Sequence, residues 1–423
     1  MGANLRQRSL KESIISLAFV QGADYLVPLL AIPYLLRVLG SEGYGKIAFV
    51  QAFCAYFVML AEFGFGWTGT RRIAVERDNR TLRSGTFWAV QSVKLSMALV
   101  SFVIAGVLVA TVPQLRALST LFLLGMLPVI GAVMYPLWFL QGLEQMREAA
   151  GIMLCVRFAL LAGVFLMVDT PEDLNVAAAL QMGSTPLAGI LACWYLARTR
   201  AVDWVRPGFD GMQRQFSEGW HAFLAAASST IYRSGNAVVL GLVVGTVPVA
   251  YYSIAEKLVK AVQELSRPIA QATFPRVSAY VVESREEAIR LLRKLLLSIG
   301  GFCLCLSIAL YIFAPQIIHV VAGKGFDEAI PIMRLMAIIP FIGGMNSVLG
   351  VQTMHPFGFA REFSYFVGLA GIANILLIVP LVFWFSAKGA AVSYLVSELV
   401  LLISLILFHR HKGIHLVSSP RKD

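Results

Sequence analysis

Five charged side chains crowd into one apolar stretch, residues 251–275, which reads YYSIAEKLVKAVQELSRPIAQATFP. In chain order they are Glu256, Lys257, Lys260, Glu264 and Arg267. Such groups neutralise one another, hold a polar or ionic ligand, or, in the case of the carboxyls, carry protons. Which of these chemistries is open to them depends on whether water, lipid or protein surrounds them.

The surroundings of these charges are strongly apolar. The 423 residues are 58% hydrophobic and 14% charged, with a mean hydropathy of +0.74, whereas soluble chains carry about 25% charged residues. Apolar runs of about 18 residues or more cross a bilayer as helices, because lipid offers no partner to backbone N–H and C=O groups. About twelve such runs are present, beginning near residues 13, 46, 86, 117, 150, 175, 217, 248, 295, 329, 361 and 388. The sequence therefore predicts an all-α polytopic membrane protein.

Lys and Arg are spread unevenly over the loops between these runs. Basic short loops stay on the cytoplasmic side of a membrane, and the basic loops here lie around residues 71–83, 198–214 and 276–294. The loop at 169–173 is acidic and falls on the opposite side. Both termini are therefore predicted to be cytoplasmic. The net charge of +11 is explained by this topology and by attraction to anionic lipid, and no nucleic-acid partner is expected.

The two halves of the chain resemble each other weakly. VLGSEGYGKIAFVQ (38–51) aligns with VVGTVPVAYYSIAE (243–256), and LQGLEQMREAA (140–150) with LGVQTMHPFGFAREFS (349–364). Coincidence remains an alternative. The matches predict two six-helix bundles related by a pseudo-two-fold axis along the membrane normal. The predicted domains are an N-terminal bundle (1–197), a cytoplasmic linker (198–215), a C-terminal bundle (216–410) and a cytoplasmic tail (411–423).

Polar residues recur on the first, second, seventh and eighth predicted spans. Positions 256, 260, 263, 267 and 271 share one face of a helix, and Pro268 and Pro275 can bend it. The further polar candidates are Gln263, Asn236, Arg233, Asp24 and Glu62. A charge at mid-membrane costs about 2.5–3.5 kcal/mol on insertion scales, so such residues usually face a partner or water. We therefore expect a hydrated chamber between the two bundles.

A packing role for these charges is the alternative. Glu256 with Lys260, and Lys260 with Glu264, are i,i+4 pairs that can neutralise one another along the helix. This alternative leaves Arg233 and Arg267 with no local acid, and Glu62 is a candidate partner for Arg267. The alternative stays open at this point.

Signals for enzymatic chemistry are missing from the sequence. VAGKGF (321–326) lacks the spacing of a phosphate-binding loop, and no nucleophile elbow is present. The histidines are scattered, and the five cysteines all fall inside predicted spans, where small apolar packing is their expected role. We therefore expect no enzyme activity, no cofactor and no metal.

Two stretches resemble a known family. GWHAFLAAASSTIYRSGNAVVLG (219–241) with VAYYSIAEKLVKAVQELSRPIAQATFPRVS (249–278), and SLAFVQGADYLVPLLAIPYLLRVLGSEGYGKIAFVQAF (16–53), are similar to Wzx-type O-antigen flippases. That polysaccharide-transporter family belongs to the superfamily of the multidrug/toxin extrusion (MATE) transporters, the MOP superfamily. The resemblance implies a MATE-like fold with a central cavity between the two bundles.

The resemblance also implies a function. The expected substrate is an undecaprenyl-diphosphate-linked oligosaccharide, moved by alternating access from the cytoplasmic to the periplasmic leaflet of the bacterial inner membrane for O-antigen or other surface polysaccharide synthesis. The residues expected to contact the diphosphate or the sugars are Lys257, Lys260, Arg267, Arg233, Gln263 and Asn236. Those expected to couple transport to an ion or to supply counter-charge are Asp24, Glu62, Glu256 and Glu264.

Other functions stay in view. An ion-coupled multidrug exporter of the same superfamily would suit cationic substrates, and a net acidic cavity would favour this alternative. A membrane-embedded polysaccharide polymerase or ligase would act at the periplasmic face, where the loops are nearly free of charge. A scaffold role is a third alternative. A polysaccharide polymerase and a chain-length regulator in the same membrane are candidate partners, and we expect a monomer.

Overall fold

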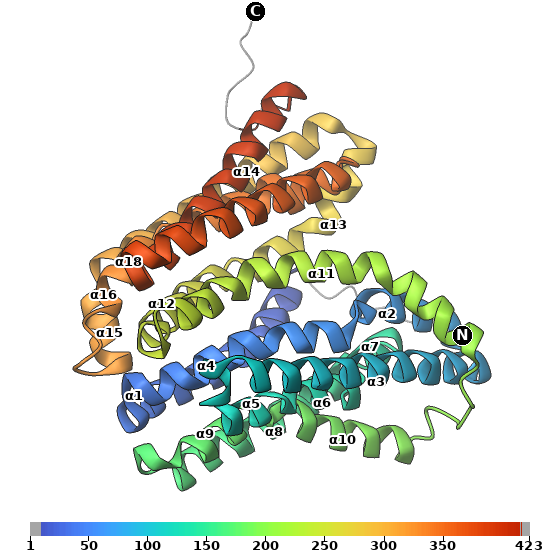
Figure 1. Ribbon diagram of the computed structural model, residues 1–423. Coiled ribbons are helices and arrows are strands. Elements are labelled where there is room, and N and C mark those ends of the chain that lie inside the picture. The colour runs from blue at the N-terminus through green and yellow to red at the C-terminus, as the bar shows by residue number, and fades with distance from the viewer. Residues whose placement is uncertain (1–9, 415, 417–423) are drawn as a thin grey trace, which may run out of the picture. The chain divides into compact units, whose positions relative to one another are not determined.

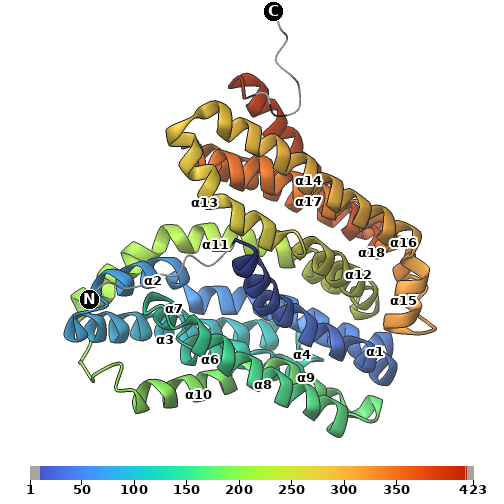
Figure 2. The same ribbon diagram turned by 180° about the vertical axis from the view of Figure 1, so that it is seen from behind.

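The structure is a computed structural model that describes residues 10–414 and 416, and their side chains except those of 10–29, 225, 228, 229, 232 and 233. Within that part of the chain every regular element is a helix (Figure 1, Figure 2). The helices up to residue 243 are α1 (Leu10–Glu62), α2 (Phe65–Glu76), α3 (Arg80–Thr111), α4 (Pro113–Arg116), α5 (Ser119–Gly125), α6 (Leu127–Met134), α7 (Leu137–Gly142), α8 (Met146–Met167), the 3₁₀ turn η1 (Pro171–Asp173), α9 (Leu174–Met182), α10 (Ser184–Arg198) and α11 (Phe209–Val243).

The remaining helices complete the all-α architecture. They are α12 (Thr246–Glu264), α13 (Arg267–Glu283), α14 (Arg285–Ile312), α15 (Ala314–Ala322), α16 (Ala329–Met336), α17 (Ile339–Asn346), the π-helix η2 (Ser347–Met354) and α18 (Ala360–His411).

Many of these helices are suited to lipid. Within the described residues, 8 helical segments are long and apolar enough to cross a membrane. Only 11% of the most apolar part of α8 is buried inside the protein, so most of that surface needs lipid around it. The prediction of an all-α polytopic membrane protein is confirmed.

Two of the long helices are broken by a single residue. Gly40 in α1 has φ 65° and Ser386 in α18 has φ 51°, both in the left-handed region. The breaks lie between the apolar runs predicted to begin near residues 13 and 46, and near 361 and 388. Each long helix therefore contains two successive predicted spans.

The chain divides into two compact units. One comprises residues 27–250, and the other comprises residues up to 26 together with 251–423. Helix α11 is grouped with the helices that precede it, whereas the sequence predicted a boundary before it, at 198–215. The boundaries of the predicted bundles and the axis between them stay a prediction.

The unit of residues 27–250 is held together by aromatic rings where α1, α2 and α11 meet. The ring of Phe63 stacks on that of Phe223 with centroids 4.8 Å apart and on that of Phe216 at 4.6 Å. Gly64 has φ 76°, and a Cβ there would lie 2.7 Å from the Cβ of Ala222 on α11. Only glycine fits this junction without strain, and the junction fixes α11 against α1.

The unit that contains residues 251–423 packs α14 against α17, and α17 against α18. A Cβ on Gly344 of α17 would lie 2.9 Å from the sulfur of Cys303, and one on Gly300 of α14 would lie 3.2 Å from the sulfur of Met345. Small residues at helix crossings let membrane helices approach closely. Cys303 and Cys54 are buried free thiols, in line with the predicted packing role of cysteine, whereas Cys155, Cys193 and Cys305 are exposed.

Candidate transport site

A pocket of about 430 Å³ opens within the unit of residues 27–250. Its walls come from α1, from the region of α5 and α6, from α9 and from α11. The lining residues are Gln51, Cys54, Ala55, Val58, Met59, Glu62, Gly125, Pro128, Gln181, Met182, Thr230 and Ser234. Most of its walls belong to helices apolar enough to cross a membrane, and its lining is largely apolar with a few polar side chains among it.

The polar groups of this pocket are neutral apart from one carboxylate. Gln51 Nε2 donates to Gln181 Oε1 over 3.3 Å, which joins α1 to α9. The hydroxyls of Thr230 and Ser234 on α11 and the carboxylate of Glu62 complete the polar lining. Amides and hydroxyls both donate and accept hydrogen bonds, so the lining suits a hydroxyl-rich ligand such as a sugar.

A buried lysine lies near the carboxylate of this pocket. Lys94 on α3 is only 3% exposed, and Glu62 interacts with it electrostatically. A cation inside a membrane helix usually faces a partner. Glu62 is the candidate counter-charge for Lys94, whereas the sequence suggested Arg267 as the partner of Glu62.

Helix α12 carries the central ion pair of the other unit. Lys260 Nζ lies 2.8 Å from Glu256 Oε1, with side chains 35% and 13% exposed. The hydroxyl of Tyr252 donates to the same carboxylate oxygen over 3.3 Å, and Lys260 Nζ lies 5.9 Å from the ring centroid of Tyr394 on α18. The spacing predicted this i,i+4 pair. The pair is consistent with both interpretations, neutralisation between packed helices and a charged lining of a cavity.

The predicted charged helix face is interrupted. Helix α12 ends at Glu264 and α13 begins at Arg267, so Arg267 and Gln271 do not continue the helix of Glu256 and Lys260. Pro268, near the start of α13, has no N–H to continue the hydrogen-bond ladder. The predicted helical face is therefore correct for positions 256, 260 and 263, and wrong for 267 and 271.

Arg267 has an acid beside it. Its Nη1 lies 3.1 Å from Glu264 Oε2, with the two side chains 51% and 31% exposed. The expectation that Arg267 lacks a local acid is wrong, because the turn between the helices brings the two residues together as an i,i+3 pair. At this exposure such a pair contributes at most about 1 kcal/mol to stability.

The other predicted site residues have different surroundings. Lys257 on α12 is partly buried, and the amide of Gln263 packs directly over Gly343 of α17. Asn236 on α11 is buried, at 1% exposed. Asp24 and Arg233 lie outside the side chains that the structure describes, so their predicted roles stay predictions.

A buried polar pair was missed by the sequence reasoning. Asn346 Nδ2 donates to Glu398 Oε2 over 2.8 Å, and joins α17 to α18 at the start of the π-helix η2. Gln352 within η2 donates to the carbonyl of Ala270 over 2.6 Å. A lone carboxylate in the run SYLVSELVLLISLIL was the available signal, because carboxylates inside membrane helices are rare and paired.

Solved structures share this architecture. The lipid II flippase MurJ in an inward closed conformation aligns with a TM-score of 0.72 at 12% identity, over 95% of this chain and 89% of that one. An inward-facing multidrug resistance MATE transporter of the MOP superfamily aligns with a TM-score of 0.65 at 13% identity, over 93% of this chain and 100% of that one. The fold is therefore that of the MATE and MurJ class of membrane transporters, as the sequence resemblance implied.

The chain belongs to the family described as "Polysaccharide biosynthesis protein", whose profile matches residues 10–281. A protein of Escherichia coli (strain K12) named "Putative O-antigen transporter" is 29% identical over 408 residues, which cover 96% of this chain and 98% of the relative. A protein of the same name from Shigella dysenteriae is 25% identical over 400 residues, with 94% and 99% covered. These relatives and the structural neighbours are transporters, not enzymes.

Proposed function

We propose that the protein is a flippase that moves undecaprenyl-diphosphate-linked oligosaccharide units from the cytoplasmic to the periplasmic leaflet of a bacterial inner membrane. The observation that carries this proposal is the set of polar and charged side chains in the pocket and on α12 of a predominantly apolar chain whose relatives are named O-antigen transporters. The headgroup of such a lipid cannot cross hydrocarbon unassisted, because desolvating its charges and hydroxyls is too unfavourable.

The two units supply different chemistry in this proposal. The pocket of Gln51, Gln181 and Glu62 supplies hydrogen-bonding groups for sugars. Lys257, Lys260 and Arg267 supply cations for the diphosphate, with Lys as a compact charge and Arg as a planar donor fork. Arg233 and Asn236 on α11, and Gln263, remain proposed contacts of the same substrate.

The proposed mechanism is alternating access driven by an ion. A carboxyl in a partly desolvated site can exchange a proton during the cycle, and the candidates are Asp24, Glu62 and Glu256, with Glu264 as counter-charge. The proposed orientation keeps both termini in the cytoplasm. If neutralising Asp24, Glu62 and Glu256 together leaves transport and its response to a proton uncoupler unchanged, this coupling is wrong.

The function is tested by deletion in the native host and complementation with Lys257→Ala and Lys260→Ala. A flippase defect accumulates lipid-linked single repeat units on the cytoplasmic leaflet, whereas a polymerase defect displays single units at the cell surface. Lys294→Ala is the matched control, because Lys294 is an exposed lysine in the first half of α14, outside both the pocket and α12. Full surface polymer with both site variants, or single units at the surface, would contradict the proposal.

A further inference from the structure

A second pocket, which the proposed transport function does not use, lies in the unit of residues 27–250. Its volume is also about 430 Å³. It is lined by Arg77, Asp78, Arg80, Arg83, Leu143, Gln145, Thr199 and Ala201. The three arginines come from the turn between α2 and α3 and from the first turn of α3. The other lining residues belong to the loops that come directly after α7 and α10 in the chain. Three separate loops therefore meet at the pocket.

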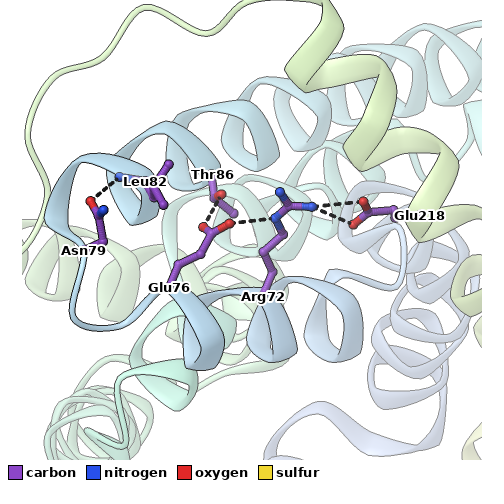
Figure 3. A network of polar contacts seen from close by, with 6 residues as sticks. All are labelled: Arg72, Glu76, Asn79, Leu82, Thr86 and Glu218. Atoms are coloured by element: carbon purple, nitrogen blue, oxygen red, sulfur yellow. Dashed lines mark hydrogen bonds and ion pairs between the residues drawn. The ribbon is translucent and has the colours of Figure 1, made fainter.

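The turn that carries the arginines is held firmly in place. Figure 3 shows Arg72 between two acids, with Nε 2.9 Å from Glu76 Oε1 and Nη1 3.0 Å from Glu218 Oε1 on α11. Thr86 Oγ1 on α3 donates to Glu76 Oε2 over 2.6 Å. The side chain of Asn79 caps α3 by accepting the backbone N–H of its third residue over 3.1 Å. Helices α2, α3 and α11 thereby fix the arginine-bearing turn.

Two of the converging loops adopt an unfavourable backbone conformation. Glu144 and Arg200 have φ values of 61° and 48°, a region that non-glycine residues rarely occupy. Each of the two residues comes shortly after the end of a helix. The residue after each donates its N–H back to that helix, Gln145 to the carbonyl of Leu140 over 2.8 Å and Ala201 to the carbonyl of Leu196 over 3.1 Å. Backbone strain of this kind often accompanies ligand sites, and here both strained residues border one pocket.

Arg77 and Arg80 carry N–H donors that can bind an anion. Arg77 Nη1 pairs with Glu144 Oε2 at 2.8 Å, with side chains 43% and 78% exposed, and Arg80 pairs with Asp203 at similarly high exposure. Such exposed pairs contribute at most about 1 kcal/mol each, so they exchange readily for a phosphate, which arginine binds in bidentate fashion. Neither paired acid lines the pocket.

Arg83 has a supporting role as well. Its Nε donates to the carbonyl of Ala201 over 3.2 Å, and its Nη1 to the carbonyl of Arg77 over 2.8 Å. Its Nη2 makes no hydrogen bond within the part of the chain that the structure describes, and it lies in a residue that lines the pocket. Arg83 therefore ties two of the loops together and still offers a donor to a ligand.

The pocket lies beside aromatic residues typical of the membrane interface. Trp88 Nε1 donates to the carbonyl of Asp203 over 2.9 Å, and the Trp88 and Trp204 rings lie 4.4 Å apart. Trp204 is 73% exposed. Tryptophan gathers at the level of lipid headgroups, where its ring is in apolar surroundings and its N–H is bonded. Because Asp203 also pairs with Arg80, these tryptophans lie next to the arginine pocket and support a position at headgroup depth.

We propose that this pocket binds the phosphodiester headgroup of an anionic phospholipid in the leaflet that faces the arginine-rich loops. Arg77 and Arg80 bind the phosphate, and Arg83 holds the loops and adds one donor. Gln145 and Thr199 accept hydrogen bonds from headgroup hydroxyls, which favours phosphatidylglycerol. A resident lipid is not the transported substrate, so this lipid can bind whether or not the proposed transport function is correct.

The test is a binding titration on the full chain purified in a neutral detergent. Fluorescent phosphatidylglycerol is titrated into the wild type, into Arg77→Gln/Arg80→Gln, and into the control Arg285→Gln/Arg290→Gln, which removes two exposed arginines from α14. The pocket variant is expected to raise the dissociation constant at least about tenfold, and the control by less than about twofold. Phosphatidylcholine and inorganic phosphate serve as competitors, and neither is expected to displace the probe.

A second measurement uses the wild type alone, so that misfolding of a variant cannot decide the outcome. Phosphatidylglycerol with a photoreactive headgroup is crosslinked, and the modified peptides are mapped. Crosslinks within residues 77–83, 143–145 or 199–201 support the proposal. It is overturned by crosslinks confined to other segments, by equal affinities of the pocket variant and wild type, or by displacement with inorganic phosphate, which would make this a site for free phosphate.

Discussion

The side chains of Asn346 and Glu398 form a buried hydrogen bond between α17 and α18, with Asn346 Nδ2 2.8 Å from Glu398 Oε2. Their exposed fractions are 6% and 8%. The bond lies where α17 gives way to the π-helix η2, a type of distortion often found at functional sites. It therefore holds the irregular segment against the last long helix.

Removing this bond should destabilise the protein. Glu398→Ala takes away the carboxylate acceptor and leaves Asn346 Nδ2 with the longer bond to the main-chain carbonyl at position 398, 3.3 Å, at a cost of about 1–2 kcal/mol. Glu398→Gln keeps an acceptor oxygen and should lose less. The check is thermal unfolding in detergent. A melting temperature for Glu398→Ala equal to that of the wild type, or lower for Gln than for Ala, would contradict the expectation.

The ion pair of α12 allows its packing role to be separated from substrate binding. Lys260→Ala leaves Glu256, 13% exposed, without its nearest cation and should lower both stability and transport. In the double variant Glu256→Ala/Lys260→Ala no uncompensated charge remains, so stability should recover. If Lys260 binds the substrate diphosphate, or Glu256 carries the coupling proton, transport should stay low.

The readouts for this pair are melting temperature and surface polysaccharide in the deletion host. Recovery of both in the double variant would show that the pair serves neutralisation only. Arg267→Ala/Glu264→Ala is the matched comparison, because that pair is more exposed and should affect stability by less than about 1 kcal/mol.

Helices α11 and α1 lie so close together at Gly241 of α11 that a larger residue there should lower stability. A Cβ on Gly241 would collide with the ring of Phe49, whereas one on Gly235 would lie 3.5 Å from the hydroxyl of Tyr56, an ordinary contact. Gly241→Ala should therefore destabilise by about 1–3 kcal/mol. Gly235→Ala should be neutral or stabilising, because alanine favours a helix.

These two variants are compared by thermal unfolding of the purified protein. Phe49→Leu in the Gly241→Ala background should restore part of the loss by making room for the added methyl group. Equal melting temperatures for the Gly241→Ala and Gly235→Ala variants would show that the helices can move apart at no cost.

The polar pocket should be reachable from water. In a variant without native cysteines, Gln51→Cys and Glu62→Cys should react with a membrane-impermeant thiol reagent added to opened membrane vesicles, because both residues line the pocket. Leu376→Cys, on the exposed apolar surface of α18 well inside the first of its two spans, should not react, since lipid covers it. The measurement is the labelled fraction by mass spectrometry. Protection of both pocket positions in inward- and outward-facing states would exclude a hydrated passage.

The sequence predicted the helices well because long apolar runs permit little else in lipid. It also predicted the Glu256–Lys260 pair, since i,i+4 spacing fixes that contact within one helix. It missed the Gln51–Gln181 bond because the two residues are 130 positions apart, and only tertiary packing joins them. Pro268 indicated a bend, but one continuous polar face was predicted across the break between α12 and α13, because polar residues continue at helical spacing on both sides of it.

Pro268 has a consequence for hydration within the bilayer. Because its nitrogen carries no hydrogen, the carbonyl of Glu264 cannot receive the usual bond from four residues further along, and the N–H groups of Leu265 and Ser266 bond three residues back, at 3.2 and 3.3 Å. An exposed carbonyl in hydrocarbon is too unfavourable to persist. The freed carbonyl therefore needs a partner from water, a side chain or a neighbouring helix, and the amides of this joint should exchange with deuterium faster than those in the middle of α14.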